Sequence, residues 1–242
     1  MKNPRHLRSF ALIVMPLAAS AAPWTAQEQA AWKDGQFEVS ALYGKAPKLG
    51  DGLDFYGASV AGGYYFGNHL LQLECGALLS ESAGNGTISG VNPANPAQSF
   101  TMRITDMEIQ RIPVWLNYRY GRNFGAHGRF RLEAGPVLGA SVETLRSEYD
   151  LTVTEGTTVS RYRDRSEQSG GLAFEYGVAA AARARLGDHW SLVAGYRWVR
   201  STEVEFRHHT KELDTSTLWV YQNARIEAHS THYVSLGAEY RF

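Results

Sequence analysis

The sequence lacks several features that anchor or cross-link other proteins. It has one cysteine, Cys75, in 242 residues, so no intramolecular disulfide can form. Beyond residue 21 it has no apolar run of about 18 residues, which excludes a membrane-spanning helix. Its 24 basic residues equal its 24 acidic residues, and this balance leaves no basic surface for nucleic acid. What the sequence does have is 24 glycines and a recurring alternation of apolar and polar residues.

The N-terminus has the three parts of a secretory signal peptide. A basic front precedes an apolar stretch at 10–19, and Ala19-Ser20-Ala21 is a small-residue cleavage site. We therefore predict that residues 1–21 are removed on export. Loss of three basic residues leaves 21 basic against 24 acidic residues, a net charge of −3.

Residues 22–34 form a leader before the first alternating segment. Thr25 and Glu28 match a capping box, and Gly35 is suited to the C-terminal cap of a helix. The leader is therefore either a short helix or a disordered segment.

Alternating segments recur from residue 35 to the C-terminus. Eight of them have the period of two that predicts strands, and they lie at 35–44, 54–66, 70–80, 100–120, 129–145, 171–186, 189–206 and 226–242. An even number of antiparallel strands can close into a barrel that leaves no unpaired edge in lipid. We therefore predict an all-β domain over 35–242, an eight-stranded antiparallel up-and-down transmembrane β-barrel.

The connections between these segments alternate in length. Short ones lie at 67–69, 121–128 and 187–189, and long ones near 45–53, 81–99, 146–170 and 207–225. Outer-membrane barrels have short periplasmic turns and long extracellular loops. Because about 9–11 tilted residues cross the hydrocarbon, roughly half of 100–120 should protrude. The stretch 146–164, with Glu155-Gly156 at its centre, predicts a hairpin above the membrane.

Aromatic residues gather at the ends of the segments. Those near the short turns are Phe37, Tyr64, Phe66, Tyr118, Tyr120, Phe130, Trp190, Tyr240 and Phe242. Those nearer the long loops include Tyr43, Tyr56, Phe174 and Trp198. Two such belts fit the two interfaces of a membrane, where aromatic rings lie at headgroup depth.

Four stretches carry a resemblance to a known family. They are RIPVWLNYRYG at 111–121, GRFRLEAGPVLG at 128–139, WSLVAGYRW at 190–198 and the terminal VSLGAEYRF. With them, the chain resembles the small outer-membrane β-barrels of the OmpA, OmpX and opacity-protein type. The resemblance implies a place in the bacterial outer membrane, with outer-membrane lipid, lipopolysaccharide and the barrel-assembly machinery as partners.

The C-terminal strand resembles the signal that the assembly machinery reads. Its apolar residues occupy every second position up to the last residue, and they are Val234, Leu236, Ala238, Tyr240 and Phe242. We expect these residues to act as the assembly signal.

The polar face of the segments carries many charges. If the apolar face meets lipid, these charges point into the lumen, and they are Glu38, Glu74, Glu108, Glu133, Glu175, Glu239, Arg119, Arg131, Arg183, Arg185, Arg197 and Arg241. Buried charges are tolerable only when paired, and eight strands enclose a space that side chains just fill. We therefore predict a lumen closed by a Glu/Arg network, because a selective pore more often shows rings of one sign.

The apolar residues change parity within the fourth segment. Met107 and Ile109 share one parity, whereas the apolar residues from Ile112 onward have the other. We expect a β-bulge near Gln110–Arg111 to absorb one residue, next to Pro113, which cannot donate to the ladder.

Few residues indicate a metal-binding or catalytic site. His208 and His209 lie beside acidic residues in a long loop, but no metal-ligand spacing accompanies them, and solvated histidines are the preferred interpretation. Ser230 and His232 share the lipid-facing parity, as a lipid-modifying hydrolase would require. Cys75 shares a face with leucines and is interpreted as a small lipid-facing hydrophobe.

We expect a structural or adhesive protein that interacts through its long extracellular loops with an external ligand. It is predicted to have no enzymatic activity, no cofactor, no metal and no nucleic-acid partner. The alternatives are a narrow porin-like channel and a lipid A-modifying enzyme.

Overall fold

The computed structural model describes residues 35–47, 53–82, 87–92, 94–125, 128–206, 209–212, 218–221 and 225–242. Eight long strands form the main body: β1 (Gly35–Ala46), β2 (Leu53–Phe66), β3 (His69–Ser82), β5 (Asn95–Phe124), β6 (Phe130–Glu155), β7 (Thr158–Arg185), β8 (Trp190–Ser201) and β13 (His229–Arg241). Five short strands lie in the long connections: β4 (Thr87–Asn92), β9 (Val204–Glu205), β10 (His209–Glu212), β11 (Leu218–Tyr221) and β12 (Arg225–Ile226). The predicted signal peptide and leader lie outside the described residues.

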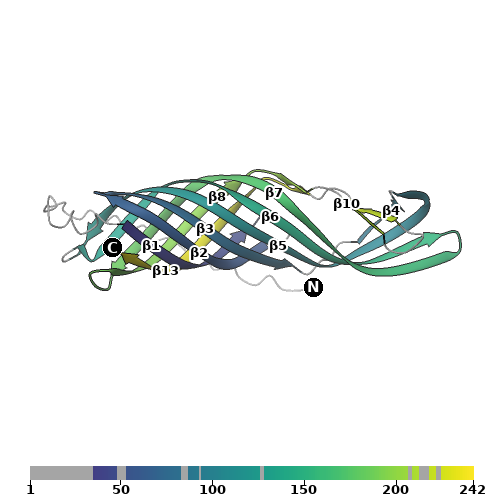
Figure 1. Ribbon diagram of the computed structural model, residues 1–242, viewed down its shortest axis with the longest axis horizontal. Helices are drawn as coiled ribbons and strands as arrows, with labels where there is room; N and C mark the ends of the chain where they lie inside the picture. Colours follow the sequence, from purple (N-terminus) through teal and green to yellow (C-terminus); the bar gives the residue numbers. More distant parts are fainter. Residues whose placement is uncertain are drawn as a thin grey trace, which may run out of the picture.

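The eight long strands form a closed antiparallel ring. Their order is β3-β2-β1-β13-β8-β7-β6-β5, and pairing of β3 with β5 closes the circle. Figure 1 shows the tilted strands of this barrel, with the C-terminus at one end. The predicted eight-stranded up-and-down barrel is confirmed. Among the described residues no helix is long and apolar enough to cross a membrane.

The barrel closes because each strand alternates between an apolar outer face and a buried inner face. Along β1, for example, the burial alternates residue by residue from Gln36 to Ala46. Outward residues such as Leu73 and Leu192 are exposed, and inward residues such as Glu74 and Val193 are buried. The outer surface of the ring is therefore an apolar band.

Short turns lie at one end of the barrel. Gly67 and Asn68 join β2 to β3, and Gly67 has a φ of 65° that favours glycine. The amide of Phe242 donates to the Gly35 carbonyl at 3.1 Å, so the last residue lies beside the first described one. Both chain ends of the barrel are therefore at the short-turn end.

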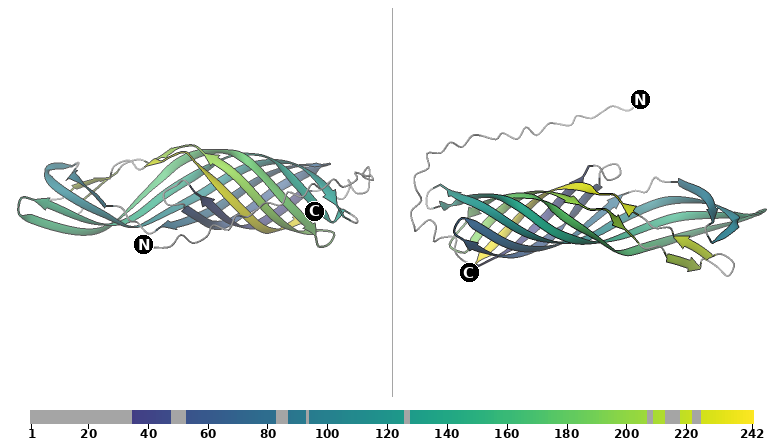
Figure 2. Two further views of the ribbon diagram at one scale, coloured as in Figure 1. Left: turned by 180° about the vertical axis from the view of Figure 1, so that it is seen from behind. Right: turned by 90° about the horizontal axis from the view of Figure 1, so that it is seen from above.

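Three strands continue far beyond the other end of the barrel. There β4, β5, β6 and β7 form a sheet that Figures 1 and 2 show as a long extension. The β6–β7 hairpin turns at Gly156-Thr157, where Gly156 has a φ of 59° and Glu155 pairs with Thr158. The predicted hairpin over 146–164 is confirmed, and β5 protrudes as expected.

The predicted bulge is at another position. The β3–β5 register is the same on both sides of Gln110–Arg111, so no residue is absorbed there. The register of β5 against β6 shifts instead between Ile104 and Asp106, above the barrel. Ile109 is the reason for the wrong prediction, because it is buried inside the barrel and does not face lipid.

Candidate functional site

The lumen near the short turns is organised around Arg183 on β7. Its guanidinium contacts Glu38 at 2.9 Å, Glu133 at 3.1 Å and Glu239 at 2.9 Å, and donates to the Tyr65 hydroxyl at 2.7 Å. The three carboxylates come from β1, β6 and β13. One arginine thus joins strands on different sides of the ring.

Glu133 is shared by two further arginines. Arg119 and Arg131 each contact it at 3.1 Å, and Arg131 also lies over the Tyr65 ring, 5.0 Å from its centroid. The phenol of Tyr65 donates to Glu239 at 3.0 Å. The charges of this layer are therefore paired, as buried charges require.

A second polar layer lies at mid-barrel. Arg197 pairs with Glu74 and stacks on Trp115, with its guanidinium carbon 3.9 Å from the ring centroid. The Trp115 indole donates to Glu175, which also accepts from Ser141 at 3.0 Å. Trp115 is fully buried, and its ring contacts side chains of β7 and β8.

Arg111 occupies the same layer. It forms an ion pair with Glu143, donates to the Tyr233 hydroxyl at 2.9 Å and lies 3.0 Å from His229 Nε2. It also lies 3.6 Å from Glu175. Arg111 therefore links β5 to β6, β7 and β13.

Toward the long loops the interior becomes apolar. Phe55, Leu78 and Ile109 from the barrel pack in one buried cluster with Val204 and Phe206 from the β8–β13 connection. Ile226, at the other end of that connection, joins the same cluster. The outer mouth is thus filled by apolar side chains, which the sequence analysis did not predict.

One small cavity lies among the charged side chains of the lumen. The cavity among Glu38, Glu74, Arg119 and Arg197 has a volume of about 10 Å³, room for about one water molecule. Six arginines and six glutamates are buried among the described residues: Arg111, Arg119, Arg131, Arg183, Arg197, Arg241, Glu38, Glu74, Glu133, Glu143, Glu175 and Glu239. The two signs balance.

Two residues of the predicted network lie elsewhere. Glu108 lies on the extension, where it contacts Arg146 at 3.3 Å outside the lumen. Arg185 has the inward parity but is only partly buried, at the short-turn end of β7. The prediction missed Arg111 and Glu143. Glu143 has the same parity as Glu133, so the alternation in the sequence could have predicted that it points inward. Arg111 was missed because the predicted bulge reversed the face to which it was assigned.

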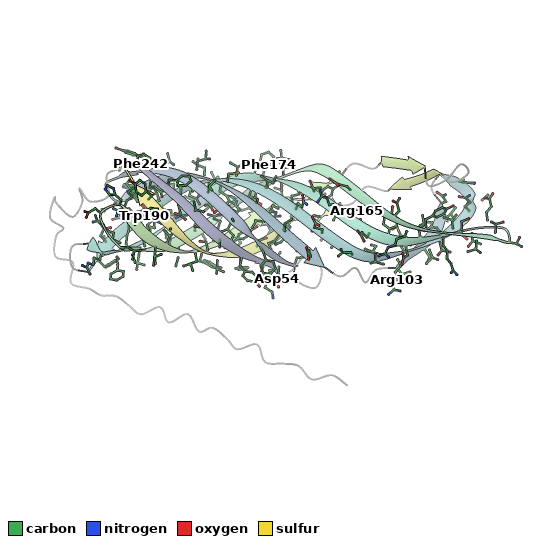
Figure 3. The ribbon with its side chains drawn as sticks, turned by 60° about the horizontal axis from the view of Figure 1, so that its bottom comes forward. Asp54, Arg103, Arg165, Phe174, Trp190 and Phe242 are labelled. Atoms are coloured by element: carbon green, nitrogen blue, oxygen red, sulfur yellow. The ribbon has the colours of Figure 1, made fainter. Side chains whose placement is uncertain are left out.

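The extension has a solvent face rich in arginine. Arg103, Arg161, Arg163 and Arg165 are exposed there, and none forms an ion pair with another described residue. The register aligns Arg103, Asp150 and Arg163 in one row across three strands. Figure 3 labels Arg103 and Arg165 on this part of the molecule. The opposite face buries Tyr149, Leu151 and Val153.

Nearer the barrel the extension carries a salt-bridge cluster. Arg146 contacts Glu108 at 3.3 Å and Glu167 at 3.0 Å. The hydrogen bond to Glu167 and the charges of both carboxylates raise the pKa of Arg146 above its ordinary value.

The other residues considered as candidates for catalysis or metal binding lie outside the lumen. His232 is exposed on the outer surface, and its Nδ1 is 2.7 Å from the Tyr196 hydroxyl. Cys75 is exposed among outward residues of β3. Within the described ranges no group of three or more His, Cys, Asp or Glu could hold a metal ion. His208 lies outside those ranges.

The residues of the predicted assembly signal all point outward. Val234, Leu236, Ala238, Tyr240 and Phe242 are exposed on β13 or directly after it. Figure 3 shows Phe242 and Trp190 at the same end of the barrel.

Comparison with solved structures found the following similar proteins. Neisserial surface protein A is 14% identical over 86% of this chain and 97% of its own, with a TM-score of 0.45. Ail, the attachment invasion locus protein of Yersinia pestis, is 12% identical over 87% and 99%, with a TM-score of 0.40. A major outer membrane protein from Thermus thermophilus is 14% identical over 86% and 99%, with a TM-score of 0.46.

No curated protein was found to match the sequence. Residues 12–242 match the family model described as the outer membrane protein beta-barrel domain. The match spans nearly the whole chain and includes all eight strands of the ring. The chain belongs to the outer membrane protein beta-barrel family.

Proposed function

We propose that this outer-membrane barrel is a surface-interaction protein, with a closed lumen that is structural and an extracellular sheet that binds an external partner. The observation that carries the proposal is the division of β5, β6 and β7 into a membrane part and a long extension. A barrel needs only about 9–11 residues per strand to cross the hydrocarbon. These strands have 30, 26 and 28 residues, so much of each serves the extension.

The extension has two features of a contact surface. Its solvent face carries Arg103, Arg161, Arg163 and Arg165, which have no ionic partner among the described residues, and arginine is enriched in protein recognition surfaces. Among the described strands its outermost strand, β4, pairs only with β5, and it exposes Ile88 and Val91. An unpaired edge can accept a further strand from a partner.

Whole-cell binding tests the proposal. Residues 149–164 are replaced by an Asn-Gly turn, which joins Glu148 to Arg165, positions that already pair across the β6–β7 hairpin. Cells with the intact protein should adhere to host cells or matrix, and cells with the shortened hairpin should not. Equal adhesion at equal membrane levels of folded protein contradicts the proposal.

A narrow channel is the first alternative. A porin-like role needs a continuous water path, whereas the interior consists of two paired polar layers and an apolar layer at the outer mouth. Ion conductance of the purified protein distinguishes the two roles.

A lipid A-modifying enzyme is the second alternative. Ser230 and His232 share the outer face, but the group that contacts His232 Nδ1 is the Tyr196 phenol, where a hydrolase would use a carboxylate. Mass spectra of lipid A decide this alternative. Spectra that differ between wild-type and His232→Ala cells would favour the enzyme, and identical spectra with and without the protein would remove it.

A further inference from the structure

The outward residues of three adjacent strands end in a group of polar side chains, two of which are cationic. Along β1 the outward face is apolar from Phe37 to Tyr43, and the next outward residue is Lys45. Along β8 it is apolar from Trp190 to Trp198, and the next is Arg200. On β13 the apolar outward residues end at Val234, and His232 and Ser230 follow. All of these polar residues lie at the rim of the apolar band nearest the long loops.

The strand register brings these residues together. Lys45 pairs with His232, His232 pairs with Trp198, and Arg200 pairs with Ser230. Side chains directly opposite on one face lie about 5 Å apart, and diagonal neighbours about 7–8 Å. Lys45, Ser230, His232 and Arg200 therefore form one patch, which we call the rim patch, over β1, β13 and β8.

The rim patch has cationic groups that the protein does not neutralise. Arg200 is exposed and forms no ion pair with any described residue. The Nδ1 atom of His232 lies 2.7 Å from the Tyr196 hydroxyl. This contact does not use the Nε2 atom of the ring. Lys45 contacts Asp54 at 3.7 Å, but both side chains are solvent-exposed, and such pairs contribute little.

The charges at this rim are distributed unevenly around the barrel. The corresponding outward residues on β2 and β3 are acidic, Asp54 and Glu81, and Asp54 appears in Figure 3 at this end of the barrel. Arg146 on β6 continues the same row, but Glu108 and Glu167 pair with it at 3.3 and 3.0 Å, so the weakly paired cations of this rim lie on β1 and β8. A cation at the membrane interface is tolerated best beside an anionic headgroup, because phosphate oxygens accept charge-assisted hydrogen bonds from arginine.

We infer that the rim patch binds the phosphate groups of lipid A, the glycolipid anchor of lipopolysaccharide in the outer leaflet. Arg200 and Lys45 lie on strands separated by β13 and are offset by two residues along it, which places their backbones about 12 Å apart. That span suits a bisphosphorylated glycolipid better than a phospholipid with one phosphodiester. The acyl chains would lie on the apolar outer surface of the same strands, along Tyr196, Val234 and Leu236. Ser230 and His232 thus have a binding role without any hydrolase chemistry.

The inference depends on the outer-membrane location and not on the proposed adhesive role. Purified wild-type protein in detergent is titrated with lipopolysaccharide, with the same lipopolysaccharide after chemical dephosphorylation, and with phosphatidylglycerol. Bound lipid is measured by native mass spectrometry. Wild-type protein should bind the phosphorylated lipopolysaccharide at least about tenfold more tightly than either other lipid, the difference expected for one or two charge-assisted contacts.

The variant K45Q/R200Q/H232Q should lose this preference. The matched control R122Q/R129Q, which changes two exposed charges near the short turns, should keep it. Arg200→Gln alone removes a side chain without an ionic partner among the described residues, and it should lower the preference even if the triple variant does not fold. A folded triple variant with the full phosphate preference overturns the inference, and so does equal displacement of lipopolysaccharide by phosphatidylglycerol.

Discussion

Arg183 on β7 contacts Glu38 on β1 at 2.9 Å, although β13 and β8 separate the two strands in the ring. The ion pair therefore crosses the lumen and does not follow the wall. Because Arg183 also contacts Glu133 and Glu239, its removal would leave three buried carboxylates close together. The lumen network is in this sense centred on one cation.

Arg183→Ala should lower the free energy of unfolding by about 3–5 kcal/mol, the cost of leaving a buried charge without its partner. Leu192→Ala is the control, because Leu192 faces outward and lipid can fill part of the gap. Urea-induced unfolding in lipid vesicles measures both. Adding Glu239→Gln to Arg183→Ala should recover part of the loss, since it removes one of the like charges. A loss for Arg183→Ala no larger than that for Leu192→Ala contradicts a tightly paired lumen.

Gly171→Val should disturb the apolar layer at the outer mouth. A Cβ on Gly171 would lie 2.2 Å from Val204 Cγ1 and 3.1 Å from the Phe206 ring. We expect faster trypsin cleavage after Arg225, which lies exposed in the connection that carries these residues. Gly62→Val is the matched control, because a Cβ there meets nothing within 4 Å. Equal cleavage rates in the two variants would show that the connection does not depend on this packing.

Phe242→Ala should reduce the amount of folded barrel in the membrane. The side chain is 71% exposed, so its loss removes little packing, and a lower yield would indicate a role in assembly. Phe66→Ala is the control, because Phe66 is an exposed aromatic at the same end of the barrel but within the chain. The readout is the heat-modifiable band in membrane fractions. Equal yields for both variants would remove the proposed assembly signal.

An epitope inserted between Gly156 and Thr157 should be accessible to antibody on intact cells. The two-residue turn lies at the tip of the longest hairpin, far from the short-turn end of the barrel. An epitope between Gly67 and Asn68, at the short turn between β2 and β3, should be detected only after the cells are opened. The reverse pattern would mean that the barrel has the opposite orientation.

The period of two in the sequence was sufficient to predict the ring. Each barrel strand alternates so regularly that the lipid side and the lumen side follow from parity, and Glu133 and Arg183 lie inside accordingly. Parity predicted the wrong direction for side chains around one apolar residue that points inward. Ile109 belongs to the apolar layer at the outer mouth, and once it was assigned to lipid, Glu108 was placed in the lumen and Arg111 was overlooked.

Partner choice within the lumen could not be predicted from parity. Arg183 contacts carboxylates on β1, β6 and β13, and contacts across the lumen depend on strand tilt and closure, which a linear pattern does not contain. The inward fold of Val204 and Phe206 was equally hidden, because these residues lie in a connection without extended alternation. The rim patch likewise required the register between β1, β13 and β8.

Planar-bilayer recording of the purified wild-type barrel tests the central claim most directly, namely that the lumen is closed. Among the described residues, two layers of paired Glu and Arg and an apolar outer mouth occupy the lumen, and the cavity between the charged side chains has a volume of only about 10 Å³. We expect no reproducible conductance from protein whose folding has been verified by heat modifiability. A large, reproducible, ion-selective conductance from the same folded protein would contradict the closed lumen and favour the channel.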